Sequence, residues 1–160
     1  MKKIILIIGI LIGLTIGVSS QETTPMEKLF LQKVNAYRIS EGIDTLNFSP
    51  IAYKIGKDKS GGLYDGTILN LDTVLVKPYG VEGTQISAKN NLYDPKDGSV
   101  RTDEVLVNSV MDFWTEGIER GVYLLTHFDV GNGNLYDGAV ATTLMDGVYY
   151  YTLVIHERIK

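Results

Sequence analysis

The chain has 160 residues, of which 44% are hydrophobic and 21% charged, a balance typical of a globular domain and unlike a disordered or collagen-like chain. It carries 19 acidic residues against 15 basic ones without a basic cluster, which excludes the electrostatic footprint of a nucleic-acid-binding protein. It contains no cysteine, so it can form no disulfide and cannot be lipidated through a leader cysteine.

Residues 1–20 have the pattern of a secretory signal peptide. Lys2 and Lys3 form a short basic segment, residues 4–18 are almost wholly apolar, and small residues precede Gln21. The apolar run is shorter than the roughly 20 residues of a membrane span, so we expect cleavage before Gln21 and not retention as an anchor. Cleavage leaves 13 basic residues against 19 acidic ones, a net charge near −6. We therefore expect a secreted, extracellular or periplasmic domain without affinity for an anionic membrane.

The segment 27–40 is predicted to be the first helix of this domain. Four apolar side chains lie on one helical face, namely Leu29, Phe30, Val34 and Tyr37. Glu27 and Arg38 lie outside this face. Gly42 follows at the position where a left-handed residue ends a helix at least cost.

Ser49 and Pro50 predict the start of a second helix. Serine is a favoured N-cap residue, and proline is favoured at the first helical position. We expect this helix to be weak, because Gly56 interrupts its pattern and Gly61 with Gly62 ends it.

The segment 105–125 is predicted to be the most deeply buried helix. Apolar side chains recur along it at helical spacing, at Leu106, Val110, Trp114, Ile118 and Val122. Trp114 is the only tryptophan and should mark the densest part of the core. Thr102 or Asp103 is expected to cap the start of this helix.

Several segments have the composition of β-strands. Residues 66–78 predict one or two strands, and residues 81–89 predict a further short extended segment. Residues 138–145 and 148–155 predict two strands, and the Asp146-Gly147 pair between them is typical of a tight hairpin turn.

Turn-forming residues at 90–101 and 131–137 predict surface loops. Helices followed by strands predict the α+β class with antiparallel pairing.

Read together, these segments resemble a CAP domain, the superfamily of cysteine-rich secretory proteins, antigen 5 and pathogenesis-related proteins, also called SCP-like. The first helix bears an Asn-x-x-Arg pair at Asn35 and Arg38, VMDFW is similar to the family's helix that ends in Trp, and YDGAVATTLMDGVYYYTLVI is similar to its last hairpin. The resemblance implies a CAP-like domain over residues 26–160, folded as a three-layer α-β-α sandwich with a central antiparallel sheet.

Many members of this family carry two His and two Glu around a central cleft, in some cases with a bound metal. The corresponding segments lack both histidines: Asp58 or Lys59 replaces one, and residues 117–120 contain none where the other is expected. Thr84 and Gln85 align best with a Glu-Asn pair. The resemblance therefore implies a degenerate cleft with no catalytic or metal-binding assignment. Its candidate ligand-binding residues are Asp58, Glu82, Gln85, Glu116, Glu119 and His127.

The sequence favours a secreted, non-catalytic CAP-like domain that binds an extracellular or cell-envelope ligand or protein. We expect no cofactor beyond a weakly held divalent cation, for which clustered carboxylates would supply oxygen ligands. Two alternatives stay open. One is a hydrolase of peptide or cell-wall substrates that uses the cleft carboxylates with His127, and the other is a carrier of a sterol or fatty acid. His127 is expected in a loop and His156 at the surface, neither with a serine partner.

Overall fold

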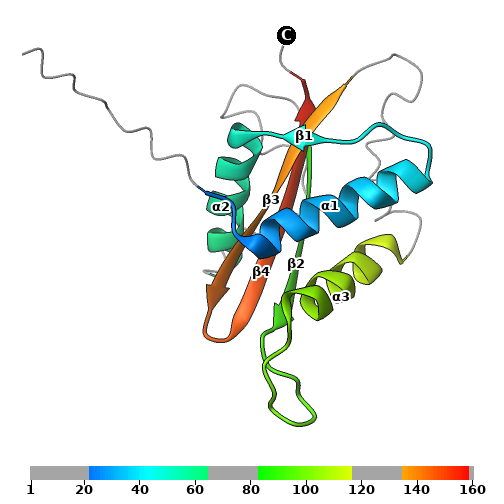
Figure 1. Cartoon of the computed structure of the whole chain (residues 1–160). Helices are drawn as coiled ribbons and strands as arrows, with labels where there is room; N and C mark the ends of the chain where they lie inside the picture. Colours follow the sequence, from blue (N-terminus) through cyan, green and yellow to red (C-terminus); the bar gives the residue numbers. More distant parts are fainter. Residues whose placement is uncertain (1–21, 65–82, 117–134, 159–160) are drawn as a thin grey trace, which may run out of the picture.

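The computed structural model describes residues 22–64, 83–116 and 135–158, which form three helices and a four-stranded sheet (Figure 1). In chain order the elements are α1 (Pro25–Ser40), β1 (Asn47–Phe48), α2 (Pro50–Tyr64), β2 (Gly83–Asn91), α3 (Asp103–Thr115), β3 (Tyr136–Met145) and β4 (Val148–Glu157). The predicted leader and the predicted strands at 66–78 lie outside the described residues. Within the described ranges, no helix is both long enough and apolar enough to cross a bilayer.

Helix α1 begins two residues earlier than its apolar pattern predicts. The Thr24 side chain accepts a hydrogen bond from the Glu27 amide, the Glu27 side chain accepts one from the Thr24 amide, and Pro25 occupies the first turn. The helix ends as predicted, since Gly42 adopts a φ of 75° just beyond it.

Helix α2 begins at Pro50 as predicted, with the Ala52 amide donating to Ser49 Oγ. The expected interruption at Gly56 is wrong, and the helix continues past Gly61 and Gly62 to Tyr64. Gly56 marks a close approach between helix and sheet, because a Cβ atom there would lie 2.8 Å from the Cβ of Ala141.

Helix α3 is capped by Thr102, one of the two predicted residues. It ends at Thr115, so the expectation of one helix over 105–125 is wrong in extent. The Thr115 hydroxyl donates to the Met111 and Asp112 carbonyls, and Glu116 turns to extended backbone with ψ 103°. Ile118 and Val122, which extended the apolar pattern, lie outside the described residues.

The strands are arranged in the order β1-β3-β4-β2. Strands β3 and β4 form the predicted hairpin, and positive φ angles at Asp146 (51°) and Gly147 (74°) suit its two-residue turn. Strand β2 confirms the extended segment predicted near 81–89 and pairs antiparallel with β4. Strand β1 pairs parallel with β3, so the sheet is mixed and the expectation of a wholly antiparallel sheet is wrong for this strand. The α+β class is confirmed.

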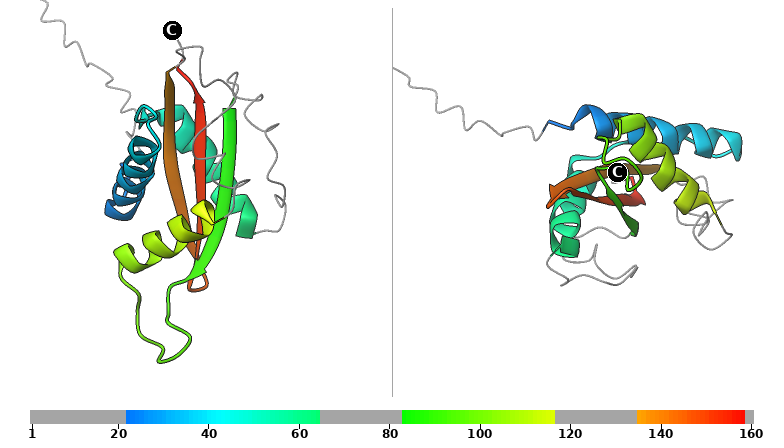
Figure 2. Two further views of the ribbon diagram at one scale, coloured as in Figure 1. Left: turned by 90° about the vertical axis from the view of Figure 1, so that its right-hand side faces the viewer. Right: turned by 90° about the horizontal axis from the view of Figure 1, so that it is seen from below.

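Both faces of the sheet carry a buried apolar cluster, because alternate side chains of a strand point to opposite faces. On one face Leu153 and Ile155 of β4 join residues of α1 and α3. On the other face Val154 joins Ala139, Ala141 and residues of α2. The right view of Figure 2 shows α1 and α3 on one side of the strands and α2 on the other.

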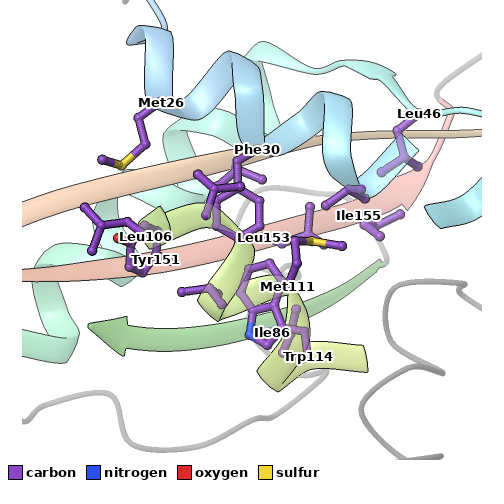
Figure 3. Packing of buried hydrophobic residues seen from close by; sticks show 14 residues of the cluster. Met26, Phe30, Leu46, Ile86, Leu106, Met111, Trp114, Tyr151, Leu153 and Ile155 are labelled. Carbon is purple, nitrogen blue, oxygen red and sulfur yellow. The ribbon is translucent and has the colours of Figure 1, made fainter. Parts of the chain in front are cut away.

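Trp114 lies fully buried in the larger cluster, as predicted (Figure 3). Its ring centroid is 4.9 Å from that of Phe30, which in turn lies 5.6 Å from that of Tyr151, both in tilted arrangements. Tilted pairs at these distances are favourable beyond their buried area. The three rings belong to α1, α3 and β4, so they pack these two helices against the sheet.

Candidate functional site

Three of the six candidate cleft residues lie in the described part of the chain. Asp58 is exposed on α2, Glu116 is exposed at the C-terminal end of α3, and Gln85 is buried on β2. Glu82, Glu119 and His127 lie outside the described residues.

The structure does not bring Asp58 and Glu116 together. They belong to helices that pack against opposite faces of the sheet (Figures 1 and 2). Gln85 lies opposite Val154 in the register of β2 and β4, and therefore on the α2 side. Its Oε1 atom is buried and has no hydrogen-bond partner among the described residues.

Within residues 22–64, 83–116 and 135–158, no three side chains of His, Cys, Asp or Glu lie close enough together to hold a metal ion. Of the described cleft candidates, Asp58 and Glu116 are thus separated by the sheet.

Glu27 lies at the centre of a buried polar network that the sequence pattern placed outside the core. Its side chain is fully buried. Oε1 accepts from Lys57 Nζ at 2.7 Å and from the Thr142 amide at 2.8 Å, while Oε2 accepts from the Thr24 amide at 2.8 Å and from the Tyr53 hydroxyl at 2.9 Å. The sequence prediction missed this residue, although the motif Thr24-x-x-Glu27, a capping box, was a signal that could have identified it.

The hydrogen bonds decide the charge state of this network. Burial by itself raises the pKa of Glu27, but the bonds from Lys57, from the Thr24 and Thr142 amides and from Tyr53 outweigh it and lower that pKa below 4.5. Burial, followed by the Glu27 carboxylate, raises the pKa of Tyr53. Glu27 is therefore a paired carboxylate with its acceptor sites occupied, which suits a structural role better than proton transfer.

His156 forms a buried pair with Ser49. Its Nδ1 lies 2.6 Å from the Glu157 carbonyl oxygen, which can only accept, so in the neutral imidazole Nε2 accepts the Ser49 hydroxyl proton over 2.7 Å. The expectation of a surface histidine without a serine partner is wrong. Strand β4 continues two residues past its predicted end, and this extension carries His156 onto the α2 side of the sheet.

A Ser–His contact of this kind resembles an activated nucleophile, but its surroundings indicate a structural role. Ser49 Oγ also accepts the Ala52 amide at the start of α2. Ser49 and His156 are 5% and 2% exposed, and neither lines the hollows beside α1 and α3. The pair fastens the N-terminus of α2 to the end of β4.

The Asn-x-x-Arg pair of the family resemblance also has structural partners. The Asn35 side chain donates a hydrogen bond to the Leu46 carbonyl and accepts one from the Leu46 amide. Arg38 Nε donates to the Asp44 carbonyl at 2.8 Å. Arg38 is only 1% exposed, although the helical pattern placed it outside the apolar face. These bonds hold the linker between α1 and β1 against α1.

Two surface hollows formed by described residues lie along α3. A hollow of about 480 Å³ covers its outer face, and a second of about 380 Å³ lies between α3 and β2. Ser109 and Phe113 line both hollows, and Glu116, one of the candidate cleft residues, lines the first.

No protein-family model matches this sequence, and neither does any curated protein. Solved structures that share its fold include two proteins of bacterial origin. A cysteine-rich secretory protein of Staphylococcus aureus subsp. aureus Mu50 is 15% identical with a TM-score of 0.54, over 83% of this chain and 38% of that one. An outer surface protein of Borrelia burgdorferi is 11% identical with a TM-score of 0.57, over 86% of this chain and 96% of that one.

The chain thus spans about two fifths of the staphylococcal protein and nearly the whole of the Borrelia protein. At these identities the likeness concerns the fold alone, and it supports the CAP-like fold that the sequence resemblance implied.

Proposed function

We propose that this chain is an exported, non-catalytic CAP-like domain that binds a ligand or protein outside the cytoplasm or in the cell envelope. In this proposal residues 1–20 are removed on export, and residues 26–160 form the domain, with helices on both sides of the sheet as the layers of an α-β-α sandwich. It has no resident cofactor, and any divalent cation is held weakly.

One observation carries the proposal. Asp58 and Glu116, which stand at or near the family's cleft positions, lie on opposite faces of the sheet. General acid–base catalysis needs its groups within hydrogen-bond reach of one substrate, which side chains on opposite faces do not offer. The described histidine, His156, is already engaged by Ser49 and by the Glu157 carbonyl.

Export is supported by the leader-like segment and by the two structural neighbours. One is a secretory protein and the other an outer surface protein. The acidic balance of the chain fits a partner that is not a nucleic acid.

The test combines a metal titration with a hydrolase assay. We expect isothermal calorimetry to show no tight Zn²⁺ binding, and incubation with peptidoglycan or casein to release no fragments. Tight Zn²⁺ binding that His127→Ala abolishes would contradict the proposal. So would hydrolysis that Glu116→Gln abolishes while the exposed Glu41→Gln control retains it.

A further inference from the structure

Side chains, in place of a strand, occupy part of the outer edge of β3. This strand lies between β1 and β4 in the sheet, and its register with β1 covers Asp137 and Gly138. Residues 139–145 therefore have β4 on one side and, within the described part of the chain, no strand on the other. What binds the backbone at this edge decides whether it can pair with another chain.

The hydrogen bonds show which backbone groups of β3 point outward. In an antiparallel pair, alternate residues direct their N–H and C=O groups toward the neighbouring strand and away from it. The Thr142 amide donates to the Glu27 side chain and not to β4, so Thr142 belongs to the outward set. By the same alternation Val140 and Leu144 belong to it as well.

Glu27 and Lys57 together bind both outward groups of Thr142. Glu27 Oε1 accepts from the Thr142 amide at 2.8 Å, and Lys57 Nζ donates to the Thr142 carbonyl at 2.7 Å. A neighbouring strand would offer one acceptor and one donor in the same way. The two side chains come from α1 and α2, which pack on opposite faces of the sheet, and they form an ion pair over 2.7 Å. The pair thus closes the edge between the two helix layers.

The pair is also held in place independently of Thr142. Glu27 Oε2 accepts from the Thr24 amide and from the Tyr53 hydroxyl, and the Glu27 side chain is fully buried. A carboxylate bound at both oxygens does not turn away from the strand, so the edge stays closed at this point.

The strand behind the pair has a composition that favours pairing with its own copies. Residues 139–145 have the sequence AVATTLM, without a charged residue, glycine or proline. Uncharged apolar and β-branched segments of this length pair readily with identical segments of other chains. Native sheets commonly protect such an edge with charges or a proline on the strand itself. Here the charges come from the neighbouring helices.

We propose that the Glu27–Lys57 pair prevents β3 from pairing edge to edge with β3 of a second copy of this chain. Two copies of one edge can pair antiparallel about a two-fold axis. A second copy would have to bind the same groups of Thr142 that Glu27 and Lys57 already bind. The inference goes beyond the proposed binding function and does not depend on it.

Sedimentation velocity of the exported protein at about 50 µM tests the proposal. The double variant Glu27→Leu/Lys57→Met removes both hydrogen-bond partners of Thr142 while keeping side chains of similar size. We expect the unmodified protein to sediment as a monomer and the double variant to form dimers or larger assemblies. Lys57→Met alone leaves the Thr142 carbonyl without its donor and should associate in the same way, to a smaller extent. Emission of Trp114 checks that each variant is folded.

Adding Leu144→Pro to the double variant shows whether β3 forms the contact. Proline has no N–H, and the Leu144 amide points away from β4, so no hydrogen bond within the sheet is lost. We expect this addition to restore the monomer. Ser49→Ala, which breaks the buried contact with His156, controls for a general loss of stability and should stay monomeric.

Amide hydrogen exchange provides a readout that needs no variant. The Thr142 amide should exchange at least about 100-fold more slowly than the Leu144 amide, because Glu27 accepts its hydrogen bond. Equal exchange rates of these two amides would overturn the proposal. So would an unmodified protein that associates, a folded double variant or Lys57→Met variant that stays monomeric, equal association of Ser49→Ala, or association that Leu144→Pro leaves unchanged.

Discussion

The Glu27 carboxylate connects three elements through hydrogen bonds. It belongs to α1, accepts hydrogen bonds from Tyr53 and Lys57 of α2, and accepts another from the Thr142 amide of β3. Lys57 Nζ donates in turn to the Thr142 carbonyl at 2.7 Å. Removing a buried charge with this many donors is costly, because the donors stay buried and lose their hydrogen-bond acceptor.

We therefore expect Glu27→Gln to lower the free energy of unfolding by about 3 kcal/mol, the cost of breaking a buried ion pair from one side. The matched control is Glu104→Gln, which removes an exposed carboxylate 4.0 Å from Lys33 and should cost no more than about 0.5 kcal/mol. Urea denaturation followed by Trp114 emission measures both. Equal losses would show that the Glu27 network contributes no more than a surface pair.

The same carboxylate gives a pH dependence. Burial raises the pKa of Glu27, but hydrogen bonds led by that of Lys57 lower it below its ordinary value of 4.5 in the folded state. The unfolded chain therefore takes up this proton at a higher pH than the folded chain. Stability from Glu27 is complete above about pH 4.5 and is lost as the pH falls through the folded pKa. Urea midpoints from pH 7 down to about pH 3 should fall less steeply in Glu27→Gln than in the unmodified protein.

The Ser49–His156 pair can be separated from ordinary helix capping. Ser49→Ala removes a cap from α2 and also leaves Nε2 of a buried histidine without its donor, so we expect a loss of about 3 kcal/mol. Thr102→Ala removes only the cap of α3, where Oγ1 accepts from the Val105 amide at 3.4 Å, and should cost about 1 kcal/mol or less. Thermal unfolding by circular dichroism compares them, and equal losses would mean that the contact with His156 adds no stability.

At the scale of the element, α2 shows how packing and propensity compete within one helix. A Cβ atom at Gly56 would meet the Ala141 Cβ at 2.8 Å and also approach the Thr152 carbonyl at 3.4 Å, whereas one at Gly61 would meet nothing within 4 Å. The absence of a side chain at Gly56 therefore permits the close contact of α2 with β3.

We expect Gly56→Ala to destabilise the protein by about 1–2 kcal/mol, because overpacking outweighs the gain in helix propensity. Gly61→Ala in the same helix should stabilise it by about 0.5–1 kcal/mol, since propensity acts there alone. The difference in urea midpoint between the two variants measures the packing term. A stabilising Gly56→Ala would mean that α2 moves away from β3 at little cost.

Local sequence signals placed the ends of several elements. Ser49 and Pro50, Thr102, Gly42 and the Asp146-Gly147 turn all lie where the pattern predicted them. Each of these signals acts through hydrogen bonds or backbone angles within about four residues, so neighbouring sequence is sufficient to specify it. The end of α3 was missed because its apolar spacing continued beyond Thr115 while the side-chain hydrogen bonds of Thr115 and the extended backbone of Glu116 ended the helix.

At the scale of the whole molecule, the leader makes a prediction that mass measurement can check. We expect the exported protein from a bacterial host to have the mass of residues 21–160, because the small residue Ser20 precedes the predicted cleavage point. Ser20→Arg should block cleavage and leave the full-length chain. Ser19→Arg, at a position where the small-residue pattern is tolerant, should still be processed. Full-length mass for the unmodified exported protein would contradict the signal-peptide assignment.

The residues of the candidate cleft could be named from the sequence, but their positions relative to one another could not be predicted from it. Asp58, Gln85 and Glu116 could be named from the family resemblance, yet which face of the sheet each lies on depends on how α2, β2 and α3 pack. The exposure of two apolar side chains of α3 was missed for a similar reason. The sequence pattern identifies the apolar residues of that helix, whereas only packing shows that Val105 and Phe113 stay exposed.

By itself the sequence determined the α+β class, the starts of all three helices to within two residues, the β3–β4 hairpin and the central place of Trp114. The tertiary structure decided that Glu27 and His156 are buried and paired. Their decisive partners are distant in sequence: Glu27 meets Thr142 across 115 positions, and His156 meets Ser49 across 107. A pattern read over a few turns or strand residues cannot contain such contacts, because they exist only once α1, α2 and the last hairpin have packed together.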